Sequence, residues 1–161
     1  MKNKKLKIFI DGGSRGNPGH GACAAAVFDD KGVLVSEEGK YLGRCTNNFA
    51  EYNGLILALS IAGRLGAAEL RVFSDSELLV KQFGGEYKIK DPVLKDLMAD
   101  IKKEVRAFNS VTVSHIPRAE NAHADRLVNV ILDNAIARGN TGLAREIAEE
   151  NRQKMHQPKL F

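Results

Sequence analysis

Apolar and polar residues alternate along several short segments of the chain, as they do in strands with one buried face. The first segment carries Ile8 and Ile10 on one side and ends at Asp11, before a glycine-rich turn. The tetrapeptide 29–32, Asp-Asp-Lys-Gly, separates the next two segments as a hairpin turn. The pattern predicts five strands, at residues 5–11, 21–28, 33–42, 69–74 and 111–116.

Four other segments carry apolar residues at helical spacing. Thr46 and the two asparagines after it are N-cap candidates, and Asp91 followed by Pro92 is a favourable helix start. Gly84 and Gly139 mark two helix ends. The pattern predicts helices at about residues 48–65, 75–83, 91–105 and 121–137.

The order of these elements predicts an α/β fold. Three consecutive strands form an antiparallel meander, and the later strands alternate with helices. We therefore expect a five-stranded mixed sheet flanked by helices, in a single domain over residues 1–139. The composition turns polar after Gly139, so residues 140–161 are expected to form a weakly helical, flexible C-terminal tail.

Composition and charge narrow the class of protein. The 161 residues are 43% hydrophobic and 27% charged, which is ordinary for a globular protein, and no apolar run approaches a membrane span or a secretory signal. The two cysteines imply no disulfide framework or zinc motif, so a cytoplasmic location is expected. Nothing in the sequence demands more than a monomer. The net charge of +4 is compatible with a nucleic-acid substrate. Four N-terminal lysines account for it, either as a solubilising terminus or as a phosphate attractor.

Four carboxylates stand where such a fold can aim them at one point. Asp11 and Asp75 each end an apolar run, and Glu51 and Asp125 lie near the starts of predicted helices. Taken singly, Asp75 could be an N-cap and Asp125 a partner of the helix dipole. As a set, they would repel each other unless divalent cations neutralised them, and hard oxygen ligands suit Mg²⁺ or Mn²⁺. The pattern indicates a metal-dependent phosphoryl-transfer site.

Four blocks of sequence, in this order, resemble type 1 ribonuclease H over residues 5–137. The blocks are Ile-Asp-Gly-Gly-Ser-Arg-Gly-Asn-Pro-Gly at 10–19, Thr-Asn-Asn-Phe-Ala-Glu at 46–51, Phe-Ser-Asp-Ser at 73–76, and the segment from His115 through Asp125 to Leu127. The resemblance implies the ribonuclease H-like fold. It also implies an endonuclease that hydrolyses the RNA strand of RNA–DNA hybrids and leaves 5′-phosphate and 3′-hydroxyl ends.

The resemblance further implies that the four acids bind two Mg²⁺ or Mn²⁺ ions. By analogy with the family, Asp11 contacts both metals, Glu51 and Asp75 hold the metal near the leaving group, and Asp125 holds the metal that activates water. One alternative is a nuclease of different specificity on the same fold. Another is a catalytically idle member that binds nucleic acid.

The glycine-rich block is expected to approach the hybrid closely, and the asparagine block to contact its DNA strand while capping a helix. The expected substrate-binding residues of these two blocks are Gly12, Gly13, Ser14, Asn17, Thr46, Asn47 and Asn48. His115 has the spacing of a family histidine that assists proton transfer or product release, with His123 as a rival.

The sequence departs in two places from the pattern of many bacterial members of the ribonuclease H family. Only residues 84–90 occupy the place of the basic handle, so Lys88 and Lys90 are expected to replace part of its substrate binding, with weaker and more salt-sensitive affinity. Glu77 stands where a glutamine is common after the third acid. A carboxylate cannot donate a hydrogen bond to a base, which puts hybrid selectivity through that contact in doubt.

The chain ends in Gln-Pro-Lys-Leu-Phe, similar to short peptides by which bacterial replication and repair proteins dock on the sliding DNA clamp. On this interpretation Gln157 makes the polar contact while Leu160 and Phe161 fill an apolar pocket of the clamp. The alternative is that the two apolar residues fold back onto the domain or are incidental.

Overall fold

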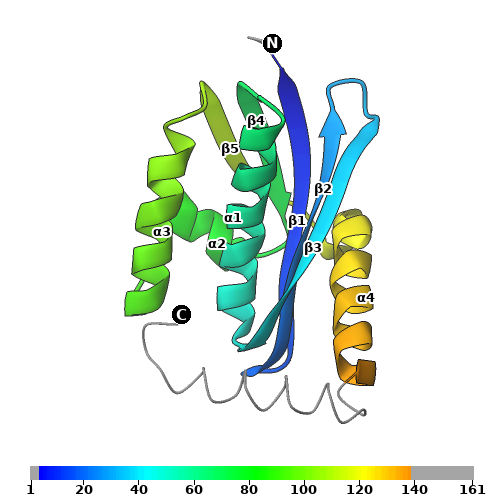
Figure 1. Cartoon of the computed structure of the whole chain (residues 1–161). Helices are drawn as coiled ribbons and strands as arrows, with labels where there is room; N and C mark the ends of the chain where they lie inside the picture. Colours follow the sequence, from blue (N-terminus) through cyan, green and yellow to red (C-terminus); the bar gives the residue numbers. More distant parts are fainter. Residues whose placement is uncertain (1–3, 139–161) are drawn as a thin grey trace.

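The computed structural model of the chain describes residues 4–138, in which a five-stranded sheet lies between helices (Figure 1). Its strands follow the order β3-β2-β1-β4-β5. β1 pairs antiparallel with β2 and β2 with β3, whereas β1 and β4, and β4 and β5, are parallel. The predicted mixed α/β sheet is confirmed. The strands are β1 (Lys5–Gly16), β2 (Gly19–Asp29), β3 (Leu34–Cys45), β4 (Glu69–Ser74) and β5 (Ser110–His115).

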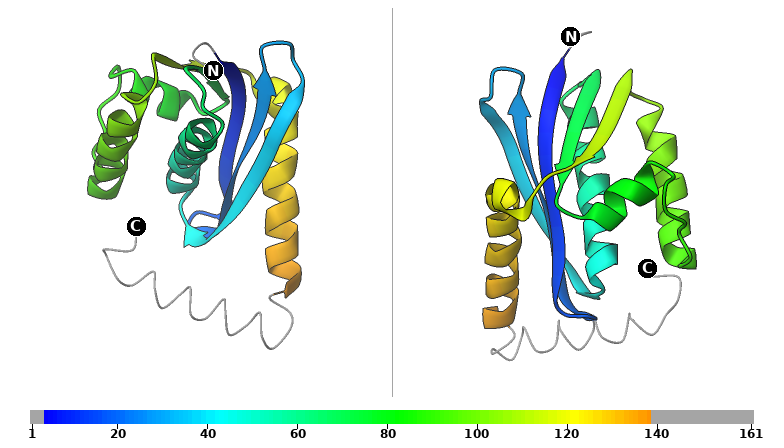
Figure 2. Two further views of the ribbon diagram at one scale, coloured as in Figure 1. Left: turned by 45° about the horizontal axis from the view of Figure 1, so that its top comes forward. Right: turned by 180° about the vertical axis from the view of Figure 1, so that it is seen from behind.

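The helices cover the two faces of the sheet unequally. α1 (Asn47–Arg64) packs on β1 and β2, with α2 (Glu77–Phe83) and α3 (Pro92–Val105) on the same side (Figure 2). α4 (Ala122–Arg138) packs on the opposite face, against β2, β1 and β3. A short 3₁₀ helix, η1 (Arg118–Asn121), leads into α4 and was not predicted from the sequence.

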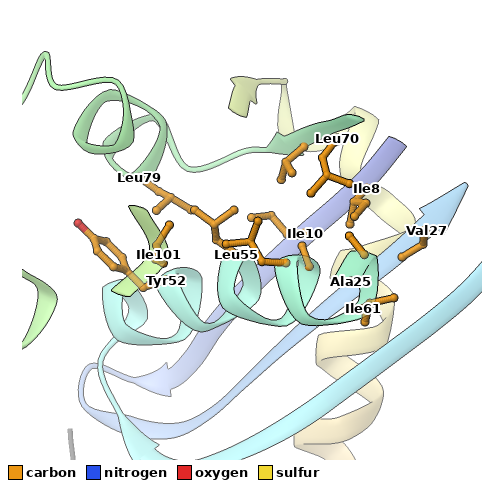
Figure 3. Close-up of a cluster of buried hydrophobic side chains, with 14 of the residues drawn as sticks. Ile8, Ile10, Ala25, Val27, Tyr52, Leu55, Ile61, Leu70, Leu79 and Ile101 are labelled. Atoms are coloured by element: carbon orange, nitrogen blue, oxygen red, sulfur yellow. The ribbon is translucent and has the colours of Figure 1, made fainter. Parts of the chain in front are cut away.

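The main hydrophobic core fills the space between α1 and the sheet (Figure 3). Leu55 and Ile61 of α1 meet Ile8 and Ile10 of β1, and all four are at most 1% exposed. On the other face, α4 packs through a smaller cluster in which Ala22 and Ala24 are the β2 residues. These short side chains let α4 lie close to β2, which places its first turn next to the middle of β1.

The first two strands are longer than predicted. Residues 12–16 continue β1 and residues 19–20 begin β2, so the glycine-rich block is mostly paired strand with a turn at Asn17 and Pro18. We expected a loop because glycines usually mark turns. Here Gly12 serves packing instead: a Cβ atom on it would lie 2.3 Å from the carbonyl carbon of Ala50 in α1.

The last described helix, α4, ends at Arg138, and the predicted domain boundary at residue 139 lies outside the described residues. The predicted tail, residues 140–161, lies outside the described residues. Among the helices of residues 4–138, none is both long and apolar enough to span a membrane.

Candidate active site

The register of β1 and β4 places two aspartates side by side. The last paired residues of this parallel ladder are Ile10 and Ser74. The residue that follows each of them in sequence is an acid. Asp11 lies within β1, and Asp75 comes directly after the end of β4. Asp11 therefore lies in the middle of a strand, at the point where the neighbouring strand ends and opens space beside it.

Close packing of α1 on β1 brings Glu51 to the same place. Besides the contact at Gly12, a Cβ atom on Gly54 would lie 3.0 Å from the carbonyl oxygen of Asp11, so two glycines permit this approach. No acid lies in the first turn of α1, so Glu51 is beyond the strongest part of the helix dipole. The helix dipole therefore stabilises the charge of Glu51 only weakly.

Ser76 orients the Glu51 carboxylate. The Ser76 hydroxyl donates to Oε2 of Glu51 at 2.6 Å, and Oγ of Ser76 accepts the backbone N–H of Leu79 at 3.2 Å. The second bond makes Ser76 the N-cap of α2. The alternative that Asp75 serves as this N-cap is wrong, and the Asp75 carboxylate is left for the site.

The fourth acid, Asp125, lies in the first turn of α4, where the helix dipole favours negative charge. Asn129, one turn later, donates from Nδ2 to the backbone oxygen of Asp125 at 3.1 Å and to its Oδ2 at 3.4 Å. The guanidinium of Arg118 lies 4.0 Å from Oδ1 of Asp125 and is largely exposed.

The four acids line one open cavity of about 380 Å³. Its other lining residues come from the glycine-rich block, from the start of α1, from η1 and from α4. They are Gly12, Gly13, Ser14, Arg15, Asn47, Arg118, Val128, Asn129 and Leu132. The structure thus brings together acids that are up to 114 positions apart in sequence, from Asp11 to Asp125.

The proximity of the acids changes their proton affinity. Burial, the neighbouring charge of Asp75 and contact with Asp125 raise the pKa of Asp11 from 3.8 to about 8, against the opposing effect of the Gly12 backbone N–H. Burial and the charge of Asp75 also raise the pKa of Glu51, and the Ser76 hydroxyl lowers it. Both shifts favour the protonated carboxyl, so a proton or a bound cation would relieve the repulsion within the cluster.

The donor set fits hard divalent cations. In residues 4–138 no three acid, histidine or cysteine side chains are arranged closely enough to hold a metal ion by themselves. Mg²⁺ does not require one, because it is usually held by one or two carboxylates and completes its octahedron with waters and substrate phosphates. An open cavity with four carboxylates and no histidine or cysteine in its lining suits such an ion.

Comparison with known proteins agrees with this geometry. A model of the reverse transcriptase-like family matches residues 9–131. Ribonuclease HI of Halobacterium salinarum is 37% identical over 131 residues, which are 81% of this chain and 66% of that protein. The chain belongs to the type 1 ribonuclease H family. The bifunctional protein Rv2228c of Mycobacterium tuberculosis is 42% identical over 132 residues, which are 81% of this chain but only 36% of that protein.

Solved ribonuclease H structures share the fold. The N-terminal RNase H domain of Rv2228c superposes with a TM-score of 0.80 at 40% identity, over 84% of this chain and 98% of that domain. LC11-RNase H1, solved in complex with an RNA/DNA hybrid, gives 0.78 at 40% identity, over 81% of this chain and 99% of that one. The ribonuclease H-like fold expected from the sequence is therefore confirmed.

The substrate-binding residues predicted from the sequence divide into two groups. Gly13, Ser14 and Asn47 line the cavity, and the Asn47 side chain accepts the backbone N–H of Ser14 at 2.8 Å. Gly12 also lines the cavity, but it is buried against α1 and its main contribution is packing. That these four residues contact the substrate stays a prediction.

The remaining residues of these blocks lie beside the cavity. Thr46 is the N-cap of α1, accepting the backbone N–H of Phe49 at 3.2 Å, as predicted. Asn17 accepts the backbone N–H of Asn47 at 3.1 Å, which ties the hairpin turn to the helix start. Asn48 is half-buried in the first turn of α1.

The candidate histidines and lysines lie outside the cavity lining. His115 is exposed at the end of β5, in register with Ser74. His123 contacts β3 instead, where its Nε2 lies 2.6 Å from Oε2 of Glu37, a residue outside the four-acid cluster. Lys88 and Lys90 are exposed between α2 and α3. Their roles in this family member stay predictions.

Sequence reasoning missed four polar residues of the site. Arg15 bridges from the glycine-rich block to α4, where it contacts Asp133 at 2.6 Å and Asn129 at 3.3 Å. Arg118 and Asn121 belong to η1, which the hydrophobic pattern did not predict. The i, i+4 spacing of Asn129 from Asp125 on a predicted helix was a usable signal.

Proposed function

We propose that this protein is an endonuclease that hydrolyses the RNA strand of RNA–DNA hybrids. The observation that carries the proposal is the convergence of four carboxylates, from β1, α1, the end of β4 and α4, on one open cavity. Its relatives support the substrate, because LC11-RNase H1 was solved with an RNA/DNA hybrid and the Halobacterium protein is named ribonuclease HI. The products are proposed to carry a 5′-phosphate and a 3′-hydroxyl.

The cofactors proposed are two Mg²⁺ or Mn²⁺ ions, held by Asp11, Glu51, Asp75 and Asp125. When bound, such ions supply charge neutralisation at the phosphate, a more acidic water and support for the leaving oxygen. Asp11 interacts with both Asp75 and Asp125, and Glu51 interacts with Asp75. These neighbour relations support Asp11 as the shared ligand, with Glu51 and Asp75 on one side and Asp125 on the other.

The protein's own residues orient the substrate and the acids. Ser76 holds the Glu51 carboxylate in place, and Asn129 does the same for Asp125. Gly13, Ser14 and Asn47 form the wall of the cavity where backbone and amide groups can meet the 2′-hydroxyls and phosphates of the hybrid. Arg118 and Arg15 also line the cavity, and their positive charge attracts a phosphodiester.

Matched oligonucleotides test this proposal directly. Hybrid, duplex RNA and duplex DNA of the same sequence are incubated with the protein, with Mg²⁺ and with chelator. We expect Mg²⁺-dependent cleavage of the RNA strand of the hybrid alone, with ends that a 3′-hydroxyl-dependent polymerase can extend. Equal cleavage of duplex RNA would indicate a nuclease of different specificity, and binding without turnover would indicate a catalytically idle family member.

A second proposal concerns residues 157–161, which lie outside the described residues. We propose that Gln157, Leu160 and Phe161 dock on a bacterial sliding clamp and so raise the local concentration of a weakly binding enzyme at DNA. Deleting the last five residues should abolish clamp association and leave cleavage of short hybrids unchanged. Surface plasmon resonance with immobilised clamp measures the first property. Equal clamp binding by the full-length and truncated proteins would refute this proposal.

A further inference from the structure

A short segment, residues 116–121, crosses from the edge strand β5 to the start of α4 and includes η1 (Figure 2). At its beginning, the backbone N–H of Ile116 donates to the carbonyl oxygen of Ser74 at 2.9 Å. Ser74 immediately precedes Asp75 in the site. This first attachment uses only backbone atoms, so it does not depend on the identity of the side chains involved.

The other end of the segment is attached by a side chain. Asn121, which is 1% exposed, donates from Nδ2 to the carbonyl oxygen of Ile10 at 2.8 Å, across 111 positions of sequence. Ile10 immediately precedes Asp11, and α4 starts at the residue after Asn121. Since Asp125 lies in the first turn of α4, this one bond connects the backbone beside Asp11 to the backbone that carries Asp125.

The other polar atom of this amide has no hydrogen-bond partner. Among the buried side-chain nitrogen and oxygen atoms of residues 4–138, Oδ1 of Asn121 is the single one without a hydrogen-bond partner. A buried oxygen without a partner lowers the stability of the folded state, so packing alone does not explain an asparagine here. Departures of this kind concentrate at functional sites. Because only the Nδ2 group of Asn121 has a partner, the hydrogen bond that it donates to Ile10 is the contribution of this side chain.

We propose that Asn121 is a positioning residue of the active site: its amide holds the start of α4 against β1, so that Asp125 and Asp11 keep the separation at which they share a divalent cation. The inference rests on the proposed function. It deepens that proposal by adding a residue that touches neither the cation nor the substrate. Without the bond, the carbonyl oxygen of Ile10 loses its donor and α4 is free to shift away from β1.

Two substitutions in the full-length chain test the role of the donor. Asn121→Asp keeps the shape of the side chain without the N–H₂ group, and Asn121→Ala removes both polar atoms. We expect the Mg²⁺ concentration for half-maximal cleavage to rise about 10-fold or more in each, as for other groups that orient metal ligands. The KM for hybrid should stay within about two-fold at saturating Mg²⁺, because no substrate contact is lost.

A second readout does not depend on cleavage. Mg²⁺ binding should raise the Tm of the wild-type protein, and this rise should shrink in both variants. If even the wild-type protein fails to cleave hybrid, the proposed function fails, whereas the Mg²⁺-dependent rise in Tm still tests the positioning role. If Asn121→Asp fails to fold because of its buried charge, the alanine variant decides the question.

Ile131→Ala is the matched control on the same helix. Ile131 packs over Gly39 of β3, so that a Cβ atom on Gly39 would lie 2.0 Å from its Cδ1, and it does not line the cavity. The control should lower the Tm without changing the Mg²⁺ requirement. An Asn121→Ala protein that loses a comparable amount of Tm but keeps the wild-type Mg²⁺ requirement would show a merely structural role and overturn the proposal.

Discussion

Replacing Asp11 with asparagine is expected to reduce hybrid cleavage by at least about 1,000-fold, the scale seen when a central catalytic group is removed. The reason is that Asp11 interacts electrostatically with two of the other acids, Asp75 and Asp125. Initial rates on a labelled hybrid with saturating Mg²⁺ measure the loss. Asp100→Asn, on the exposed side of α3, is the control and should keep wild-type activity.

The same substitution should stabilise the metal-free protein, increasingly so as pH rises. The folded state binds the Asp11 proton more tightly than the unfolded state, because its pKa is raised to about 8. The unfolding free energy of the wild type therefore falls as pH rises from about 4 to about 8, and Asp11→Asn removes this component. We expect its advantage over the wild type to grow throughout that range, by at most about 1.4 kcal/mol per pH unit.

Urea unfolding in the presence of chelator, at several pH values, measures this advantage. Glu51 also has a raised pKa, so a smaller dependence of the same sign should remain in the variant. Added Mg²⁺ should stabilise the wild type much more than the variant. Near-normal cleavage by Asp11→Asn would refute the proposed mechanism, and a variant less stable than the wild type at high pH would contradict the electrostatic account.

Replacing Gly12 with alanine is expected to separate α1 from β1 and to disable the site. The added Cβ would lie 2.3 Å from the carbonyl carbon of Ala50 and 2.5 Å from the backbone nitrogen of Glu51, so the helix must move. We expect the unfolding free energy to fall by about 2–3 kcal/mol, as in overpacked cores. Cleavage should fall further than stability explains, because the displaced backbone carries Glu51.

Gly63→Ala is the matched control for this prediction. Gly63 lies near the end of the same helix, and a Cβ atom there would meet no atom within 4 Å. This variant should be neutral or slightly stabilised, by up to about 1 kcal/mol, because alanine favours the helix. Urea unfolding and hybrid cleavage are measured for both. Wild-type stability in Gly12→Ala would mean that the close approach is not what holds Glu51 in the site.

Much of the fold was predictable because its signals are local. The alternation around Ile8 and Ile10, the cap at Thr46 and the Asp91-Pro92 helix start all depend on residues a few positions apart, and each predicted element is present. The glycine-rich block was misjudged for the opposite reason. Whether glycine makes a turn or admits a helix depends on what packs against it, and Ala50 is 38 positions away from Gly12.

The sequence by itself determined which acids are available and which ends of strands and helices carry them, because acids at the ends of apolar runs are conspicuous without a structure. Only the tertiary structure decided how they meet. The parallel register sets Asp11 beside Asp75, the glycine contacts admit Glu51, and the amide of Asn121 ties the helix of Asp125 to β1. These relations join residues up to 111 positions apart, and they arise from packing and long-range hydrogen bonding that no local pattern encodes.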